Sequence, residues 1–317
     1  MLFKSILIAG FLCIFIIGVC ANALVILLSF KPSGNVNVNV NVNTINTYLV
    51  NMAGADLLYI FGCLFYTLTN YNQDGWLFGD VGCRLILSID VLTMHVSVYI
   101  LTVMSIERYV AVVHPMLSLK YRSVGFARVI VAVIWVSALI LATPMVASMA
   151  LTRIHDGHGS VKYTCAWTLN GDDSLSTYMI SVFLITFAIP SIIMVIAYLL
   201  LMAHFCQVRS ERTGSQQVRR SKRRVAQIVF LVVLVFWICY TPFWVYQLTV
   251  LHVENFDPKQ IMGLVTLIIS YLNSCFNPFL YTLLPKRYNV WQKMRKQSSF
   301  SAPKYRLTGR PEVCDSL

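Results

Sequence analysis

The sequence predicts an all-α protein: a bundle of seven transmembrane helices followed by a short amphipathic helix on the cytoplasmic side. Its 317 residues are 57% hydrophobic and only 12% charged, whereas a soluble domain is about a quarter charged. It also contains seven apolar stretches, each as long as the roughly 20 helical residues that cross a bilayer. Such stretches must be helical in lipid, because each segment has to satisfy its own backbone polar groups.

The predicted bundle covers residues 6–284, after an extracellular segment of residues 1–5. Its spans are residues 6–30, 47–68, 85–113, 129–149, 178–204, 225–252 and 261–284. The first span could be a signal peptide, but its apolar run continues past Ala23 to Phe30, so a true helix is preferred. Residues 285–297 are basic with apolar positions, which suits a helix on the membrane surface, and residues 298–317 form a polar cytoplasmic tail.

The positive charge follows the topology. Most lysines and arginines fall in segments that alternate to one side, from Lys31 in the first connection to Arg310 in the tail. The positive-inside rule places this side in the cytosol and the amino terminus outside, in a multi-pass plasma-membrane protein. The net charge of +12 is explained in this way, so membrane lipid is an expected partner and nucleic acid is not.

The nine cysteines divide by compartment. Cys83 at the outer end of the third span and Cys165 in the second outside loop both face an oxidising compartment, so a disulfide is expected between them. Five others lie inside spans, where they are expected to pack as small residues. No CxxC pair is present, which argues against a cysteine metal site.

Asp90 is the first of three polar positions inside the predicted membrane region. It follows Cys83 by seven residues, about 10 Å along a helix, and an ionisable group at such a depth suggests function. We expect it to be the counter-ion of a ligand cation. The alternative is a buried acid that neighbours such as Tyr271 satisfy.

Asp56 lies in the middle of the second span. Ser97, Asn273, Ser274 and Asn277 are positioned to meet it, and this oxygen-rich group suits a small hard cation such as Na⁺. The alternative is a water-filled polar network without an ion. No other cofactor is expected.

Glu107, Arg108 and Tyr109 end the third span, and Arg108 lies about 27 Å along the helix from Asp90. Glu107 can hold Arg108 in one state and release it in another, which makes a switch. The alternative is an arginine that only anchors the helix end. Prolines inside later spans, at 190, 242 and 278, allow these helices to bend between two packings.

These residues resemble the rhodopsin-like (class A) G-protein-coupled receptors. The resemblance covers all seven spans. It is carried by Glu107-Arg108-Tyr109, Asn277-Pro278-Phe279-Leu280-Tyr281, Asn22, Asp56, Trp135, Cys83 with Cys165, Pro190 with Tyr198, and Phe236 with Pro242. Within that family, the stretches 92–97, 101–109 and 273–284 resemble the urotensin-II receptor branch, with somatostatin and opioid receptors as neighbours.

The resemblance implies a mechanism. A cyclic peptide would enter from outside and pair its lysine with Asp90, and the heterotrimeric G protein would be Gq-class, with arrestin and a receptor kinase as further partners. The implied ligand residues are Asp90, Met94, Tyr240, Trp244, Gln247 and Tyr271. Asn22 would join the polar network, Pro190, Val98, Phe236 and Pro242 would transmit the signal, and Tyr109, Tyr198 and Tyr281 would complete the switch.

The sequence departs from the family pattern at several positions. Tyr240 replaces the usual tryptophan, Ala21 replaces the usual glycine, and Lys222 stands where some relatives have an acid facing Arg108. The outside segments contain no N-glycosylation sequon, so either the extracellular arm is lacking or the recorded start is truncated.

Five other classes of protein fit less well. A somatostatin- or opioid-like receptor coupled to a Gi-class protein is the nearest alternative, and an aminergic receptor, which also uses an acid like Asp90, is more distant. A retinal protein needs a lysine within the seventh span, and a transporter would show an internal repeat; neither is present. No nucleophile with a matching base suggests an enzyme.

Overall fold

The computed structural model describes residues 2–30, 40–71, 75–155, 161–168, 174–210, 216–252 and 262–279. Within these residues, seven helices are long and apolar enough to cross a membrane. This confirms the predicted seven-helix fold. The expected surface helix at 285–297, the tail and Tyr281 lie outside the described residues, as does the side chain of Lys222.

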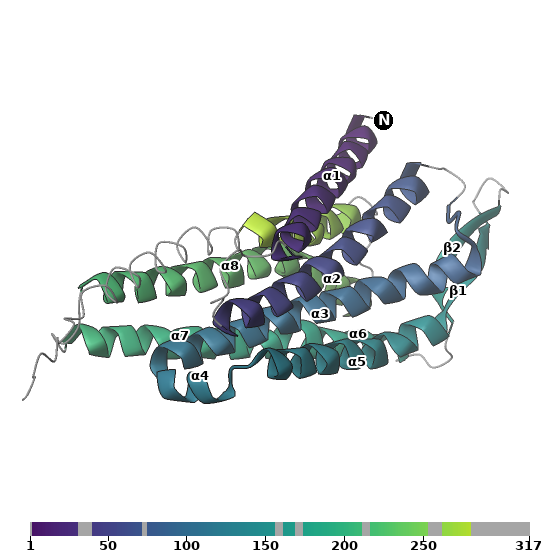
Figure 1. Ribbon diagram of the computed structural model, residues 1–317. Helices are drawn as coiled ribbons and strands as arrows, with labels where there is room; N and C mark the ends of the chain where they lie inside the picture. Colours follow the sequence, from purple (N-terminus) through teal and green to yellow (C-terminus); the bar gives the residue numbers. More distant parts are fainter. Residues whose placement is uncertain are drawn as a thin grey trace, which may run out of the picture. The chain divides into compact units, whose positions relative to one another are not determined.

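The elements follow one another in a simple order (Figure 1). They are α1 (Leu2–Phe30), α2 (Val40–Tyr71), α3 (Gly79–Val113), α4 (Pro115–Tyr121), α5 (Val124–Ser148), β1 (Met149–His155), β2 (Val161–Trp167), α6 (Ser174–Phe183), the π-helical segment η1 (Leu184–Ala188), α7 (Ile189–Ser210) and α8 (Gln216–His252). The seventh span is the helix Met262–Phe279.

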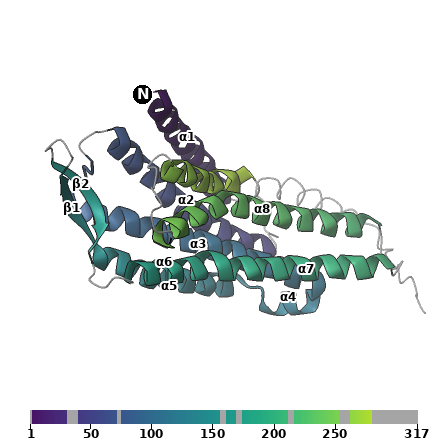
Figure 2. The ribbon, with the colours of Figure 1, turned by 180° about the vertical axis from the view of Figure 1, so that it is seen from behind.

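The two ends of the bundle carry different elements. The hairpin of β1 and β2 lies at one end and α4 at the other, and the views from front and back agree (Figures 1 and 2). We call these the hairpin end and the α4 end. The amino-terminal end of α1 lies on the same side as the hairpin (Figure 2). Since α3 begins beside the hairpin, Asp90 lies toward the hairpin end and Glu107 toward the α4 end.

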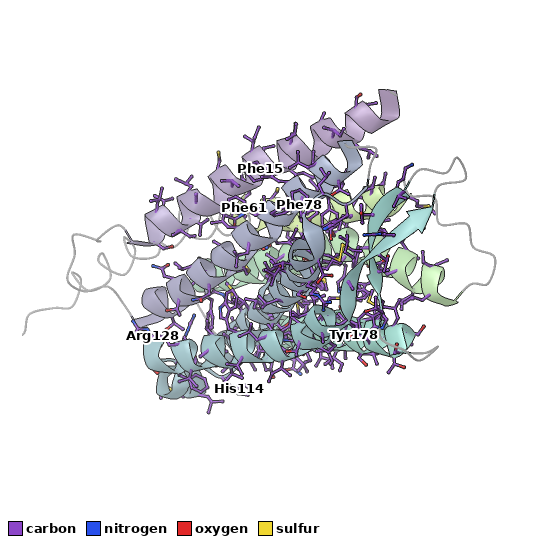
Figure 3. All side chains as sticks on the ribbon, turned by 90° about the vertical axis from the view of Figure 1, so that its right-hand side faces the viewer. Phe15, Phe61, Phe78, His114, Arg128 and Tyr178 are labelled. Carbon is purple, nitrogen blue, oxygen red and sulfur yellow. A yellow bond between two sulfur atoms is a disulfide. The ribbon has the colours of Figure 1, made fainter. Side chains whose placement is uncertain are left out.

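Helix α3 is the central helix of the bundle. In its most apolar window 67% of the residues are buried, against 22% in α5. The outward faces of α1 and α5 are rich in exposed Leu, Ile and Val side chains, as expected for helices that face lipid. Helices α1 and α2 pack through aromatic side chains, with Phe15 and Phe61 in edge contact at 5.6 Å (Figure 3).

The fifth span is not a regular α-helix. Residues Ser174–Phe205 cross as α6, η1 and α7 in succession. The π-helical turn of η1 ends two residues before Pro190. Proline has no N–H for the helical hydrogen bond to the preceding turn, so the chain adopts a wider turn there. The bend predicted from Pro190 therefore coincides with a local change of helix type.

Two loops contain more structure than the sequence analysis expected. The long outside loop forms the antiparallel pair β1–β2, in which Leu151 pairs with Cys165. Residues 31–46, which connect the first two predicted spans, include an Asn-Val repeat, and from Val40 onward they belong to α2. Extending an existing helix adds one hydrogen bond per residue without a new nucleation cost, which explains why α2 begins before its apolar window at Thr44.

Candidate functional site

Asp90 is held by a residue that the sequence analysis did not name. The hydroxyl of Tyr66 on α2 donates a 2.7 Å hydrogen bond to Oδ2 of Asp90. The other oxygen, Oδ1, is buried and has no hydrogen-bond partner among the described residues. Tyr271, which the alternative interpretation named as a neighbour that could satisfy Asp90, makes no hydrogen bond to it, since the Tyr271 hydroxyl is also buried without such a partner.

A glycine on α2 makes room for this arrangement. If Gly62 carried a Cβ, that atom would lie 2.8 Å from Oδ1 of Asp90 and 3.0 Å from the hydroxyl of Tyr271. Contacts of this length require the neighbours to move. Gly62 therefore allows the carboxylate and the Tyr271 hydroxyl to approach the backbone of α2 together.

Tyr271, whose hydroxyl lies near the Asp90 carboxylate, belongs to a cluster of aromatic rings. The rings of Tyr59 and Tyr271 lie 4.2 Å apart, and Phe11 of α1 meets Tyr271 edge-on at 6.2 Å. The hydroxyl of Tyr59 is hydrogen-bonded to Ser270 at 2.8 Å. Helices α1 and α2 and the seventh span thus fix these rings.

The predicted ligand residues of α8 form an aromatic column. Trp244 contacts Phe183 of α6 at 5.4 Å between ring centres, while Tyr240 contacts Phe236 at 5.1 Å and Phe236 contacts Phe187 at 5.6 Å. The indole N–H of Trp244 is buried without a partner in the described residues. The column joins the expected ligand residues to the expected transmission residue Phe236.

The remaining ligand and transmission residues are placed on the same helices. Met94 and Val98 are buried on α3, and Pro190 is buried on α7. Gln247 and Pro242 are partly buried on α8.

Asp56 is the centre of the predicted polar network. Its Oδ1 accepts hydrogen bonds from the hydroxyls of Ser97 at 3.0 Å and Ser274 at 2.9 Å. Its Oδ2 accepts one from Nδ2 of Asn277 at 2.9 Å. Asp56 is fully buried, so these three donors from α3 and the seventh span replace the water that it loses.

The same network fits the expected Na⁺ in its chemistry. Oδ1 of Asn277 is buried and has no partner in the described part of the chain, and Asn273 is buried close by in sequence on the same helix. Hard cations prefer carboxylate, hydroxyl and amide oxygens. A bound ion would neutralise the charge of Asp56. No group of three or more His, Cys, Asp or Glu side chains in the described residues offers another metal site.

Asn22 joins α1 to the network. Its side-chain amide donates 3.0 Å hydrogen bonds to the carbonyl oxygens of Gly18 and Ser274. Since Ser274 in turn binds Asp56, α1, α2 and the seventh span meet at one polar layer.

At the α4 end, Glu107 is held from two directions. Tyr48 of α2 donates a 2.7 Å hydrogen bond to its Oε1, and Nε of Arg122 lies 3.4 Å from its Oε2. Arg122 follows α4 directly. The sequence analysis expected Arg108 as the partner of Glu107, whereas the structure shows that an arginine outside the motif also engages this carboxylate.

The other switch residues lie near the same end. Arg108 is partly buried, and the ring of Tyr109 meets His114 edge-on at 5.9 Å. Tyr198 of α7 stacks on Phe230 of α8 at 4.9 Å, so the predicted switch tyrosine contacts a helix that Pro242 allows to bend. Pro278 is buried in the seventh span.

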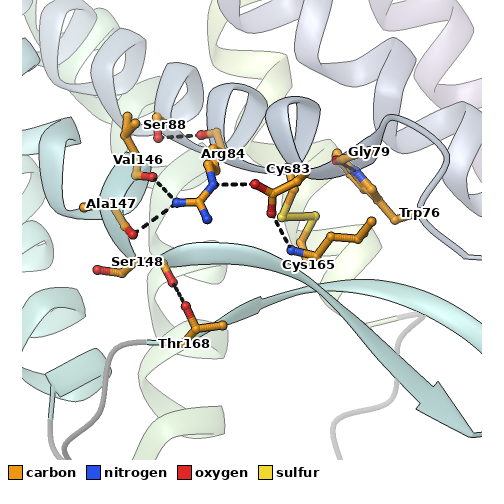
Figure 4. Close-up of polar contacts among 12 residues, drawn as sticks. Trp76, Gly79, Cys83, Arg84, Ser88, Val146, Ala147, Ser148, Cys165 and Thr168 are labelled. Atoms are coloured by element: carbon orange, nitrogen blue, oxygen red, sulfur yellow. Dashed lines mark hydrogen bonds and ion pairs between the residues drawn. A yellow bond between two sulfur atoms is a disulfide. The ribbon is translucent and has the colours of Figure 1, made fainter.

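The hairpin is attached to the bundle by the Cys83–Cys165 disulfide, as predicted. An ion pair adds to it (Figure 4). Asp80 and Arg84 pair at 2.8 Å, Arg84 donates to the carbonyl oxygens of Val146 and Ala147 at the end of α5, and Asp80 accepts from the backbone N–H of Leu151. The start of α3 thereby fixes both the end of α5 and the first residues of β1.

The sequence contained one pattern that could have identified Tyr66 as the partner of Asp90. Asp56, Tyr59, Cys63 and Tyr66 are spaced by three or four residues, which places them on one helix face. The face that carries Asp56 therefore also presents Tyr66 toward Asp90.

Comparison with known proteins identifies the family. A family model described as "7 transmembrane receptor (rhodopsin family)" matches residues 21–281. The urotensin-2 receptor of Bos taurus is 38% identical over 251 residues, which cover 78% of this chain and 63% of the relative. The urotensin-2 receptor of Macaca mulatta is 35% identical over 89% of this chain and 69% of its own length.

A third relative, the somatostatin receptor type 4 of Rattus norvegicus, is 36% identical over 85% of this chain and 67% of its own length. The chain thus spans about two thirds of the length of these relatives, and slightly less for the first. The family match extends from Ala21 in α1 past the described part of the seventh span, so it includes the polar layer, the switch and the disulfide. With its seven spans, this multi-pass membrane protein belongs to the rhodopsin family of seven-transmembrane receptors, which are not enzymes.

Proposed function

We propose that the chain is a plasma-membrane receptor for a urotensin-II-like cyclic peptide with a basic residue, and that it activates a heterotrimeric G protein. The observation that carries the proposal is Asp90: a carboxylate within the bundle toward the hairpin end, with one oxygen that has no partner in the described residues. A buried acid of this kind attracts a cation strongly, because little water screens it.

The expected ligand residues support a peptide rather than a small amine. The aromatic column of Trp244, Tyr240 and Phe236 connects the ligand end of α8 to its middle. Two relatives, 38% and 36% identical to this chain, are named for peptides, urotensin-2 and somatostatin. Aromatic side chains and a single acid are suited to a peptide that presents both apolar and basic groups.

The proposal includes a direction across the membrane. The hairpin end faces outside and the α4 end faces the cytosol, where Glu107, Arg108 and Tyr198 meet the G protein. A Gq-class protein is the first candidate, with arrestin and a receptor kinase as further partners. An Na⁺ ion at Asp56 is the proposed allosteric cofactor, and membrane lipid surrounds the bundle.

A Gi-coupled somatostatin-like receptor is the second candidate, because the rat somatostatin relative is almost as similar as the urotensin-2 receptors. Expression of the full chain in cultured cells, with calcium and cAMP readouts, separates the two. A urotensin-2 peptide should raise calcium with a potency at least tenfold above that of somatostatin. A fall in cAMP with somatostatin alone would favour the second candidate, and silence toward both peptides would contradict the proposed ligand class.

A further inference from the structure

We propose that Tyr66 and Gly62 restrict Asp90 to a one-point contact, so that the receptor selects a ligand ammonium group over a guanidinium group. This inference rests on the proposed function, because it concerns the cation that Asp90 receives. Tyr66 becomes a specificity-determining residue, although it carries no charge of its own.

The Tyr66 hydroxyl already occupies one carboxylate oxygen. Its hydrogen bond to Oδ2 is 2.7 Å long, a normal length for a hydroxyl donor. Tyr59, the nearest tyrosine on the same face of α2, does not compete for this position, since its hydroxyl is paired with Ser270.

The second oxygen is confined by the backbone of α2. A Cβ on Gly62 would lie only 2.8 Å from Oδ1 of Asp90. Oδ1 itself is buried. The hydroxyl of Tyr271 would lie 3.0 Å from that same Cβ position. Oδ1 therefore lies against the backbone of α2, close to the Tyr271 hydroxyl, while Oδ2 is taken by Tyr66, so the two oxygens are not both free to accept parallel N–H contacts.

The two cations need different surfaces. A guanidinium is planar and binds a carboxylate best through two parallel N–H···O contacts that use both oxygens. An ammonium is a compact point charge that needs one oxygen, and its other N–H groups can bind elsewhere. Here the Tyr271 hydroxyl oxygen, which has no partner within the described residues, can accept a second N–H. The site thus disfavours the guanidinium by geometry and suits the ammonium.

A test with small cations does not depend on the peptide. The full chain is purified in lipid nanodiscs, and its thermal midpoint is measured with n-butylammonium and with n-butylguanidinium. In the wild type, n-butylammonium should raise the midpoint more. Tyr66→Phe frees Oδ2 and should remove most of this difference, whereas Asp90→Asn should respond to neither cation. The matched control is Tyr99→Phe on α3, whose ring stacks on His95, and it should keep the wild-type difference.

Three outcomes would overturn the inference: equal stabilisation of the wild type by both cations, stabilisation by neither, or an unchanged difference in Tyr66→Phe. Gly62→Ala gives a second variant. Its added methyl pushes on Oδ1 and should weaken the response to both cations, while a response equal to that of the wild type would contradict the confinement of Oδ1.

A second arm compares a urotensin-2 peptide with an analogue in which arginine replaces the ring lysine. The lysine peptide should be at least tenfold more potent on the wild type, and the ratio should fall below about threefold on Tyr66→Phe. Peptides that act equally on the wild type would refute the selectivity and leave the proposed function intact. Discrimination between the small cations without any peptide response would refute the proposed ligand and leave the selectivity intact.

Discussion

The hydroxyl of Tyr48 on α2 donates a 2.7 Å hydrogen bond to Oε1 of Glu107 on α3, while Arg122 lies 3.4 Å from the other oxygen. Glu107 is therefore bound to a neighbouring helix and to the segment after α4. These two contacts of the Glu107 carboxylate stabilise the arrangement in which α3 packs against α2 and against the segment that follows α4. Any state that draws Glu107 away must break both contacts.

Loss of the Tyr48 contact should raise signalling without ligand. Hydrogen bonds between membrane helices contribute about 0.6 kcal/mol on average and rarely more than about 1.7 kcal/mol, so Tyr48→Phe should increase the active population about threefold. Basal second-messenger levels, measured at equal surface expression, test this. Tyr178→Phe is the matched control, because its hydroxyl bonds to Leu141 at the hairpin end. Equal basal levels in both variants would show that Tyr48 does not hold the switch.

Removing the charge of Asp90 should reduce peptide potency at least tenfold, because a partly buried ion pair is lost. Dose–response curves for Asp90→Asn with a lysine-bearing peptide measure this effect. Asp80→Asn changes an acid on the same helix that is exposed and paired with Arg84, and it should keep most of the potency. A similar loss in both variants would mean that the acids act through the fold rather than through ligand contact.

The Asp80–Arg84 pair should control the opening of the hairpin. Arg84 binds two carbonyl oxygens at the end of α5 and Asp80 binds the Leu151 amide, so Arg84→Gln should speed hydrogen exchange of that amide and of its neighbours in β1. Mass-spectrometric exchange on the purified chain checks this. Arg153→Gln, which removes only a contact with the Tyr163 ring, is the control. An exchange rate in Arg84→Gln that matches the control would assign the hairpin's stability to the disulfide alone.

The sequence predicted the parts of the molecule that lipid constrains. The seven spans follow from apolar length, and Asp56 with Ser97, Ser274 and Asn277 followed from the cost of leaving polar groups in such spans without partners. These residues meet in the structure as expected, whereas Asn273, predicted with them, is buried and its side chain makes no hydrogen bond within the described residues. The disulfide followed from compartment and position.

The contacts that were missed depend on tertiary packing. Tyrosine is common in membrane helices with its hydroxyl directed to any polar neighbour, so sequence alone could not decide whether Tyr66 or Tyr271 binds Asp90. The approach of Arg122 to Glu107 depends on the turn after α4, which has no periodic pattern. The hairpin was missed because its two seven-residue strands lie in a loop without clear alternation of apolar and polar residues.

Sodium should lower the affinity of the receptor for its agonist through Asp56. An ion that binds one state better shifts the population toward that state, and the effect on agonist and ion affinity is reciprocal. The oxygens at hand are those of the Asp56 carboxylate, the hydroxyls of Ser97 and Ser274, and Oδ1 of Asn277, which has no partner within the described residues. Agonist binding in NaCl should therefore be weaker than in choline chloride at equal ionic strength.

Asp56→Asn removes the negative charge but keeps the size of the side chain, so the two salts should give the same affinity in that variant. Asp80→Asn, an acid outside the polar layer, should retain the sodium effect. If wild-type affinity is the same in both salts, the layer is a hydrogen-bonded network without an ion, and Asp56 stabilises the fold through its three donors alone.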